Sequence, residues 1–588
     1  MKGPPLPEPR FATVNEALAA AARTRSGLTF VDLHEREILV PWSDVLERAA
    51  VCAGGLRHAG VLVGDRVALV LPTSPAFVDA FFGVLLAGAI PVPLYPPVRL
   101  GRLAEYHVST ARMLSCAGAR LILTDARIRR LLGRAVERAR PDLGCLTVEG
   151  ITAGPPDSFD ARVEPGSLAL IQFSSGSTVD PRPVALTHLN LVAQCAALKA
   201  LMPPERQFPQ LGVSWLPLYH DMGLIGCLLS AVYYPGPLVL IPPECFLARP
   251  VMWLRAVARH RATISPAPSF AYALCAKRVR DEDLDGADLS SWQMALCGAE
   301  PVSIEGLRRF AARFSRFGFD PRALRPAYGL AEASLAVTCA PADRRVQSVT
   351  VDPVRLAPTG EAVAGAREIV SVGTPIYGAE IEVRAEDGSL LPDRKVGRIY
   401  ARGASVMAGY FGQPEATAQS IVDGWLDTGD LGFTAGGELY VCGRAKEVII
   451  IRGSNHQPQE FEECLDGMEG VRAGCAVAVG FVPEDESEES LLMLVERAKN
   501  MTGDDGDAEL ADGIRRVVIE RTGVRPHSVV VLHPGTLPRT SSGKMKRGEA
   551  LRRFISGELD PPRRVGVAGL AVEMVRSAIA FARTRVAL

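Results

Sequence analysis

The sequence has no excess of charge of either sign and contains little lysine. Its 588 residues include 65 basic and 66 acidic side chains, and only eight of the basic ones are lysine. A chain without a basic surplus lacks the electrostatic footprint of a nucleic-acid-binding protein, so we expect no nucleic-acid partner. Two of the eight lysines, Lys544 and Lys546, fall close together near the C-terminus.

Paired cysteines and long unbroken apolar runs are also missing. The twelve cysteines include no CxxC pair and no Cys/His cluster at metal-ligand spacing, so we expect reduced thiols and neither disulfides nor structural zinc. The apolar runs 77–90 and 225–241 are broken by Asp79 and by two prolines, which argues against a membrane span. The N-terminal residues show no secretory signal. These observations predict a cytoplasmic protein.

The length and the 48% hydrophobic content predict at least two domains with sizeable cores. From residue 66 to residue 125, strand-like and helical segments alternate, which is typical of a mostly parallel α/β domain. The first 150 residues resemble scaffold, because none of them has the spacing of a catalytic site. From residue 381 the pattern changes to short strands.

The stretch 168–188 contains the first candidate site. The apolar run LALIQF predicts a buried strand that ends in SSGST, residues 174–178, and VALTH predicts a second strand. Gly176 permits a left-handed backbone, so successive N–H groups and the hydroxyls around them are suited to phosphate. The spacing differs from that of a Walker loop, because no GxxxxGK[ST] is present. A solvated hairpin turn is the alternative on local grounds.

Three further stretches combine chemical groups with turns. WLPLYHDMG, residues 215–223, precedes an apolar helix seeded with glycine and predicts either a groove with a polar rim or an ordinary buried helix with a capping His-Asp pair. GAEP, residues 298–301, is a tight turn at a strand end, which lets a planar base approach the backbone. In YGLAE, residues 328–332, Tyr328 offers a ring for purine stacking and Glu332 offers an oxygen ligand for Mg²⁺; a core tyrosine and a solvated glutamate are the alternatives.

The C-terminal third contains two more candidate positions. Asp430, in GWLDTGDLG, is expected in a turn flanked by glycines, either as a ribose ligand or as a plain Asx-turn residue. Lys544 lies near the tip of the Gly/Ser-flanked loop LPRTSSGKMKR, where a basic residue is either solvated or catalytic. The last stretch, from about residue 568, has apolar residues at helical spacing with arginine between them. It predicts an amphipathic helix packed on the domain or on a partner, rather than a membrane anchor.

Taken in order, SSGST, WLPLYHDMG, GAEP, YGLAE, the GWLDTGDLG stretch and TSSGK resemble the adenylate-forming superfamily, and most closely its fatty acyl-AMP ligases. The resemblance covers about residues 15–555. It implies an α/β fold: a large N-terminal domain, 1–443, of α/β subdomains plus a β-barrel-like subdomain, and a small mobile α+β C-terminal domain, 444–588. Lys446 would be the hinge. The long segment at about 341–370, otherwise a surface loop, looks like the insertion of fatty acyl-AMP ligases.

The resemblance also implies roles for individual residues. ATP and AMP would be bound by Ser174, Ser175, Gly176, Ser177, Thr178, Gly298, Ala299, Glu300, Pro301, Tyr328, Gly329, Leu330, Ala331, Asp430 and Arg444. The acyl chain would meet Trp215, His220, Asp221, Met222 and Ile225. The catalytic residues would be Lys544, Glu332 and His220, with Mg²⁺ held by Glu332 and Thr178. The chain departs from the family pattern at Arg182 and Pro183, where a Lys and a Gly are usual, and at Gln457, where an aromatic is common.

The implied reaction uses ATP and Mg²⁺ to convert a fatty acid into an acyl-adenylate. The acyl group then passes to the phosphopantetheine thiol of an acyl carrier protein. Two other functions remain open at this point: a long-chain acyl-CoA synthetase, and a degenerate protein that only binds a nucleotide or an acyl-adenylate. Arg182, Pro183 and Gln457 favour the degenerate binding protein. The presence of Glu332, Asp430, Arg444 and Lys544 argues against it.

Overall fold

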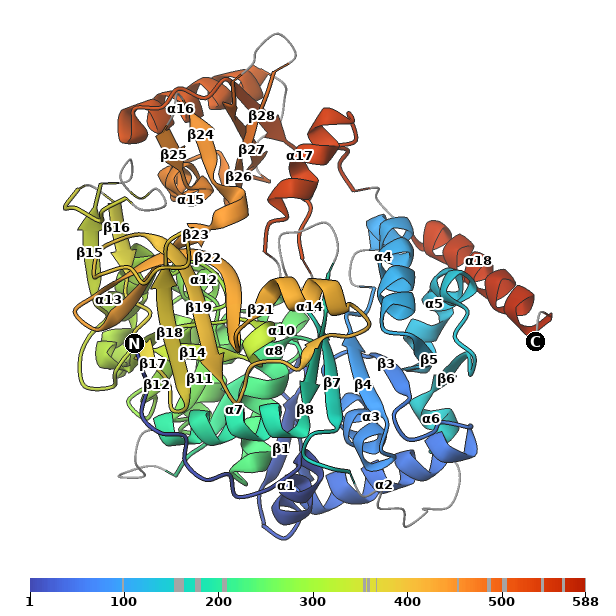
Figure 1. Ribbon diagram of the computed structural model, residues 1–588. Helices are drawn as coiled ribbons and strands as arrows, with labels where there is room; N and C mark the ends of the chain where they lie inside the picture. Colours follow the sequence, from blue (N-terminus) through green and yellow to red (C-terminus); the bar gives the residue numbers. More distant parts are fainter. Residues whose placement is uncertain are drawn as a thin grey trace.

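A computed structural model shows a large domain with a smaller domain set against one end of it (Figure 1). The small domain, orange to red, lies at the top of that view, and the last helix runs back beside the blue helices of the large domain. The structure describes residues 1–97, 100–152, 163–174, 181–202, 209–352, 356, 360–365, 367–451, 454–483, 488–499, 505–540, 544–562 and 566–586.

The first unit of the large domain is a parallel sheet in the order β4-β3-β5-β6. This confirms the parallel α/β pattern predicted from the alternation after residue 66. Gly60 ends the second helix with φ 91°, a value that favours glycine. The elements are α2 (Trp42–His58), β3 (Arg66–Val70), α3 (Pro75–Leu86), β4 (Ile90–Leu94), η1 (Leu100–Arg102), α4 (Leu103–Cys116), β5 (Ala119–Thr124), α5 (Ala126–Ala139), β6 (Cys145–Thr147) and α6 (Val148–Ile151).

A nine-stranded sheet forms the centre of the large domain, with parallel strands inside and antiparallel strands at both ends. Its order is β17 (Thr374–Pro375), β14 (Ala336–Cys339), β13 (Leu324–Gly329), β12 (Met294–Cys297), β11 (Ile264–Ala267), β9 (Gly212–Ser214), β10 (Leu238–Leu240), β1 (Gly27–Val31) and β2 (Glu37–Pro41). Associated helices are α1 (Val14–Ala21), α7 (His188–Leu201), α8 (Asp221–Gly223), η2 (Leu224–Leu229), α9 (Ser230–Tyr233), α10 (Pro243–Ala248), α11 (Val251–Arg259), α12 (Ser269–Arg278) and α13 (Ile304–Phe314). The carboxyl ends of its parallel strands deliver the GAEP turn and the YGLAE stretch to one edge.

The candidate phosphate loop joins two antiparallel strands, β7 (Leu168–Phe173) and β8 (Pro183–Thr187). The second strand confirms the interpretation of VALTH. The short strand β20 (Gly409–Tyr410) pairs with the other side of β8. Tyr410 is thereby brought next to the base of the loop.

The third unit is an antiparallel sheet ordered β18 (Ala379–Arg384), β19 (Gly397–Gly403), β22 (Trp425–Ala435), β21 (Ile421–Val422), with β23 (Glu438–Arg444) on β22 and α14 (Pro414–Ser420) alongside. It corresponds to the expected barrel-like subdomain, although the pairing of these strands does not close into a ring. The turn expected at Asp430 is wrong. Asp430 lies inside β22, because Gly429, with φ 75°, and a register shift after Leu431 absorb the irregularity without breaking the strand.

The segment at 341–370 forms an antiparallel hairpin of β15 (Ser348–Val351) and β16 (Arg367–Val370). Val351 and Ile369 of this hairpin pack with Phe433 and Tyr440 of the third unit in one apolar cluster. The described part of the segment is therefore anchored to the large domain.

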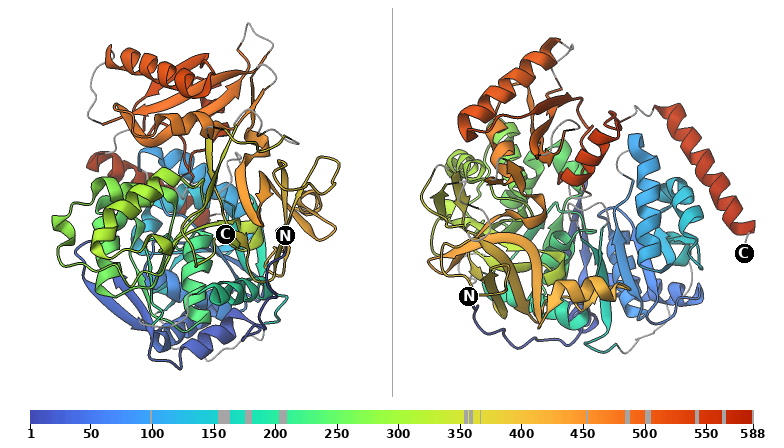
Figure 2. Two further views of the ribbon diagram at one scale, coloured as in Figure 1. Left: turned by 90° about the vertical axis from the view of Figure 1, so that its left-hand side faces the viewer. Right: turned by 45° about the horizontal axis from the view of Figure 1, so that its top comes forward.

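The small domain has its own cores on the two faces of the sheet β26-β27-β28. Its elements are β24 (Ile449–Ile451), β25 (Ser454–His456), α15 (Pro458–Glu462), β26 (Val471–Phe481), β27 (Ser490–Arg497), α16 (Asp505–Thr522), β28 (Ser528–Leu532) and α17 (Arg547–Ile555). The predicted terminal helix is α18 (Val567–Val586), which packs on α5 of the large domain (Figures 1 and 2). None of the described helices is long and apolar enough to cross a bilayer.

Candidate active site

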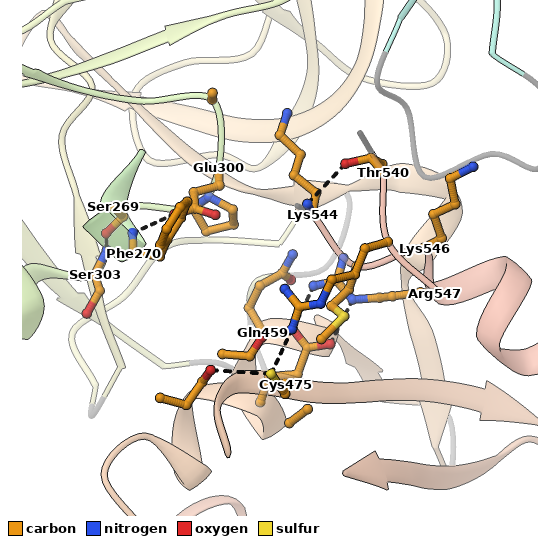
Figure 3. A pocket seen from close by; sticks show the side chains of 18 of the residues that line it. Ser269, Phe270, Glu300, Ser303, Gln459, Cys475, Thr540, Lys544, Lys546 and Arg547 are labelled. Atoms are coloured by element: carbon orange, nitrogen blue, oxygen red, sulfur yellow. Dashed lines mark hydrogen bonds and ion pairs between the residues drawn. The ribbon is translucent and has the colours of Figure 1, made fainter. Parts of the chain in front are cut away.

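A cavity of about 2600 Å³ lies between the large and small domains. Its large-domain wall comes from the end of β7, helix α4, the turn after β12, and the facing strands β22 and β23; its small-domain wall includes the loop before α17 (Figure 3). Nine of the residues predicted from sequence to bind nucleotide or act in catalysis line it: Ser174, Ala299, Glu300, Pro301, Tyr328, Gly329, Asp430, Arg444 and Lys544. Trp215, predicted to meet the acyl chain, also contributes.

The GAEP turn has a backbone that suits a closely approaching flat ligand. Ala299 has φ 68°, and a Cβ on Gly298 would lie only 2.7 Å from the carbonyl oxygen of Ala327 on the neighbouring strand. Glu300 accepts a 2.7 Å hydrogen bond from the backbone N–H of Phe270, and burial raises the pKa of its carboxyl. The turn is therefore held by short polar contacts rather than by side-chain bulk.

Asp430 is the centre of a buried polar trio. It stands directly opposite Arg444 in the β22–β23 register, and Nε of Arg444 lies 3.0 Å from Oδ1 of Asp430. The hydroxyl of Tyr328 donates to Oδ2 at 2.6 Å. Burial raises the pKa of Asp430, and the guanidinium of Arg444 opposes that rise. This geometry presents a carboxylate, a guanidinium and an aromatic ring to one side of the cavity.

Glu332 lies behind this trio, in the short turn Ala331–Ala333 that follows β13. The hydroxyl of Tyr410 donates a 3.0 Å hydrogen bond to Oε1 of Glu332, and the guanidinium of Arg182 lies 5.0 Å from the centre of the Tyr410 ring. Burial raises the pKa of Glu332. Sequence reasoning missed Tyr410, because only the pairing of β20 with β8 places it here.

The base of the candidate phosphate loop is closed by Ser174 and Arg182. The Ser174 N–H donates to the Arg182 carbonyl at 3.0 Å, and the Arg182 N–H donates to the Ser174 hydroxyl at 3.3 Å. Ser175, Gly176, Ser177 and Thr178 fall outside the described residues, so their predicted phosphate and metal roles stay predictions. Arg182, where the family usually has Lys, directs its charge to Tyr410.

The WLPLYHDMG stretch is divided between cavity and core. Trp215 lines the cavity and stacks on Phe246 at 3.9 Å between ring centres. Met222 and Ile225 are 9% and 0% exposed and belong to the main core; neither is among the described residues that line the cavity. The helix turns into a π-helix at Leu224–Leu229, an irregularity that often accompanies functional sites.

His220 and Asp221 are buried at the start of this helix. Nδ1 of His220 lies 2.5 Å from Oδ1 of Asp221, and the Met222 N–H donates to the same carboxylate oxygen at 2.7 Å. Burial would raise the pKa of Asp221, but His220 and the ammonium of Lys544 outweigh it, so the pKa is lowered. Asp221 is therefore an anion that lies within electrostatic reach of Lys544.

Lys544 reaches the site from the small domain. Thr540 and Lys544 close the base of their loop, with the Thr540 N–H donating to the Lys544 carbonyl at 2.8 Å and the Lys544 N–H donating to the Thr540 hydroxyl at 3.0 Å. The side chain extends away from Cys475 and into the cavity (Figure 3). Burial lowers the pKa of its ammonium, while the carboxylates of Asp221, Glu300 and Asp430 raise it. Lys544 is thus a half-buried cation facing three carboxylates of the large domain.

The predicted hinge residue, Lys446, lies in a 3₁₀ turn at Ala445–Glu447, where the chain passes from β23 into the small domain. Two residues before the turn, a Cβ on Gly443 would lie 2.1 Å from Oε1 of Gln457, so the Gln457 side chain packs directly against the Gly443 backbone. Arg547 pairs with Glu447 at 2.7 Å and with Glu462 at 2.6 Å. Lys446 itself is exposed, whereas Glu447 in the same turn is held by Arg547.

Helix α4 and the residue before it, Arg102 of η1, supply contacts to the small domain that the sequence interpretation did not find. Arg102 donates to the Thr536 carbonyl at 2.8 Å, and Glu105 pairs with Arg553 at 2.6 Å, so both hold the small domain in place. Arg102 and Glu105 also line the cavity. The view that residues 1–150 are only scaffold is therefore incomplete, and no motif spacing in that region signalled these roles.

The donor set fits a magnesium ion that arrives with a substrate. No cluster of three or more His, Cys, Asp or Glu suited to a metal occurs in the part of the chain that the structure describes. Glu332 instead offers a single carboxylate, and burial raises the pKa of its carboxyl group. Mg²⁺ commonly binds through one or two carboxylates plus substrate phosphates, so a single carboxylate beside the loop is compatible with it.

A lysine on a loop of the small domain and an Asp-Arg-Tyr trio of the large domain face the same cavity, in a fold that is shared with adenylate-forming ligases. The AMP-binding enzyme family matches residues 18–411, and this chain belongs to that family. Its overall fold is that of the solved adenylate-forming enzymes: one structure, from a study of fatty acyl-adenylate ligases of E. coli and L. pneumophila, is 35% identical with a TM-score of 0.87. The match covers 93% of this chain and 98% of the chain in that structure.

Two relatives that are similar over most of their length carry different names. A Caulobacter vibrioides protein that is 36% identical, covering 93% of this chain and 96% of its own, bears an acyl-CoA synthetase name. A Moorena producens protein named medium-chain-fatty-acid--[acyl-carrier-protein] ligase JamA is 32% identical, covering 94% of this chain and 97% of its own. The two names differ in the thiol acceptor.

Proposed function

We propose that this chain activates a fatty acid with ATP and then transfers the acyl group to the phosphopantetheine thiol of an acyl carrier protein. In the first step a carboxylate oxygen of the fatty acid attacks the α-phosphorus of ATP, and pyrophosphate leaves. The product is an acyl-adenylate, a mixed anhydride with a good leaving group. In the second step the thiol sulfur bonds to the acyl carbon, AMP leaves, and the thiol proton passes to solvent.

The observation that carries this proposal is the position of Lys544. Two anions, the fatty acid carboxylate and the α-phosphate, must approach each other, and their repulsion opposes the first step. An ammonium that is already positioned between them neutralises this charge with little reorganisation of solvent, which is a large contribution in an active site. The carboxylates of Asp221, Glu300 and Asp430 favour the protonated form of Lys544 before the substrates bind.

The remaining groups bind and orient. The Asp430 carboxylate is suited to both ribose hydroxyls, and Arg444 fixes it in the ionised form against the cost of burial. The ring of Tyr328 and the backbone of the GAEP turn give an adenine two flat surfaces. Glu332, oriented by Tyr410, would hold Mg²⁺, which supplies charge neutralisation at the phosphates when bound.

We further propose that the small domain alternates between two positions. The present arrangement, with Lys544 in the cavity, suits adenylation, and a rotation at Lys446 would withdraw it for thiol attack. The hairpin β15–β16 restrains that rotation, because Arg367 lies 3.7 Å from Glu463 of the small domain while the hairpin itself is packed on the large one. A carrier protein can contribute binding energy from its own surface to such a step, whereas free CoA has less to offer.

Product analysis tests this function. The protein is incubated with ATP, Mg²⁺ and a panel of fatty acids, with either CoA or a holo acyl carrier protein as acceptor, and the products are identified by mass spectrometry. We expect acyl-AMP in both and acyl-carrier protein in the second, with little acyl-CoA. Efficient acyl-CoA formation would establish the second candidate, an acyl-CoA synthetase, which the name of the Caulobacter relative favours.

A further inference from the structure

Helix α18 is bound to the large domain through one face only. The Gly133 N–H of α5 donates to the Ser577 hydroxyl at 2.8 Å, and a Cβ on Gly133 would lie 2.1 Å from the Ser577 carbonyl, so the helices cross at close range. Ser577 and Ala580 are 1% and 3% exposed, and Arg129 lies over the Phe581 ring at 4.9 Å. This face is small and closely packed.

The opposite face of α18 is also apolar, and it is open to solvent. Val572, Val575 and Ile579 are 50%, 59% and 49% exposed. The other exposed apolar residues on this helix are Ala568, Ala571, Ala578 and Ala582. Single exposed apolar residues are common on protein surfaces, whereas a continuous stripe along a helix indicates an interaction site. The right view of Figure 2 shows this helix on the outside of the molecule.

The spacing of the stripe predicts what fits it. Ala568, Val572, Val575, Ile579 and Ala582 follow one another at intervals of four, three, four and three residues. This 3.5-residue repeat is that of a helix packing along another helix, with β-branched residues at one of the two seam positions. A second amphipathic helix matches such a seam along its full length.

Charge decides which helix this is. The two paired helices, α5 and α18, contain eight arginines and two glutamates, in a chain whose overall charges nearly cancel. Arg576 and Arg583 directly follow the seam residues Val575 and Ala582; they pair with Glu573 at 2.7 Å and Glu137 at 3.3 Å, yet are still 56% and 71% exposed. In an antiparallel pair with a second copy of α18, these arginines would face each other across the seam and repel. An acidic helix would instead be attracted.

We propose that the outward face of α18 docks an acidic amphipathic helix of a partner protein, and that this partner delivers the acceptor thiol. The second part rests on the proposed function. Helix α18 packs on α5, and α5 packs on α4, which lines the cavity through Tyr106 and Arg112. A partner held on α18 is therefore on the same side of the large domain as this wall of the cavity (Figure 1). Docking raises the local concentration of the thiol without any new contact inside the cavity.

A synthetic peptide tests the docking surface directly. The probe is a fluorescent three-heptad helix with Leu at the seam positions and Glu at the flanking ones; the matched probe has Lys in place of Glu. By fluorescence anisotropy the intact protein should bind the acidic probe and not the basic one, and Val575→Glu should weaken binding by roughly tenfold or more. The matched control, Val63→Glu, alters an equally exposed valine, 67% accessible, outside this face and should bind like the wild type.

Three results would overturn the docking proposal: equal binding of both probes, unchanged binding by Val575→Glu, or occupation of the face by something else. Occupation by a membrane would appear as binding to vesicles of anionic phospholipid, and occupation by a second copy would appear as concentration-dependent self-association. In either case Val575→Glu would abolish the binding. For the acceptor part, Val575→Glu should raise the KM for a holo acyl carrier protein and leave acyl-AMP formation unchanged. Transfer with an unchanged KM would contradict the acceptor part. Absence of any transfer by the wild type would contradict the proposed function. The peptide experiment would still show whether the outward face of α18 docks an acidic helix.

Discussion

The hydroxyl of Tyr328, on β13, lies 2.6 Å from Oδ2 of Asp430, on β22. With Arg444 on the other carboxylate oxygen, Asp430 has a fixed orientation before any nucleotide arrives. Because this preorganisation lowers the cost of ordering the site on binding, it should show in the affinity for ATP.

Asp430→Asn keeps the shape of the side chain and removes its charge. Hydrogen bonds to charged groups are worth about 1.5–3 kcal/mol, so the KM for ATP should rise roughly 10- to 100-fold. Tyr328→Phe, which keeps the ring and loses one hydrogen bond, serves as the comparison and should raise KM by about tenfold at most. Steady-state adenylation kinetics measure both. A KM within threefold of wild type for Asp430→Asn would remove it from the nucleotide site.

The alkaline limb of the adenylation rate should report Lys544. Burial lowers the pKa of Lys544 below its ordinary value of 10.5, so the required ammonium is present at low pH and is lost as pH rises through the lowered pKa. Asp221→Asn removes an attraction that raises this pKa, and should move the limb to lower pH. Lys544→Arg keeps a cation at all these pH values, and its residual rate should lack the limb. A limb that survives in Lys544→Arg would belong to another group.

Lys446→Pro should separate the two half-reactions. Proline fixes φ near −65° and removes the N–H, which blocks a backbone rotation in the turn Ala445–Glu447. Acyl-AMP should still form, whereas transfer to the carrier should be lost. Lys446→Ala removes the same side chain without restricting φ and should transfer normally. Wild-type transfer by the verified proline variant would contradict the two-position account.

Arg367→Ala should increase the use of CoA. The substitution removes the contact between the β15–β16 hairpin and Glu463 of the small domain, so the rotated position becomes more accessible. Arg402→Ala, which removes an arginine paired with Glu380 inside the large domain, is the matched control. The ratio of acyl-CoA to acyl-carrier protein, measured by mass spectrometry, should rise only in the first variant. An unchanged ratio would remove this contact as the cause of acceptor choice.

Much of the fold follows from local patterns in the sequence. The parallel sheet around β3 and the strand β8 were predictable because apolar runs and turn residues alternate clearly there. The position of Asp430 was not, because a left-handed Gly429 and a register shift within β22 accommodate a sequence that otherwise favours a turn. The hydrogen bonding of β22 with β19 and β23 here outweighs the local preference of these residues for a turn.

Residues of the candidate site were predictable where each belongs to a local sequence motif. They were harder to predict where segments that are distant in the sequence come into contact. Tyr328, Asp430 and Arg444 were found from their motifs and do lie together. Tyr410 beside Glu332, and Arg102 and Glu105 against the small domain, depend on tertiary contacts between segments 78 or more residues apart. The close crossing of α5 and α18 likewise requires a glycine whose role appears only once its neighbour is placed.

Fatty-acid-dependent ATP–pyrophosphate exchange tests the central claim most directly, because it measures the adenylation step without any acceptor. The wild-type chain should exchange label only when a fatty acid is present. Lys544→Ala should lose about 10²- to 10³-fold of that rate, the loss typical of removing one preorganised electrostatic contact, while Lys546→Ala on the same loop should retain it. Exchange that is independent of fatty acid, or a Lys544→Ala rate within threefold of wild type, would contradict the account.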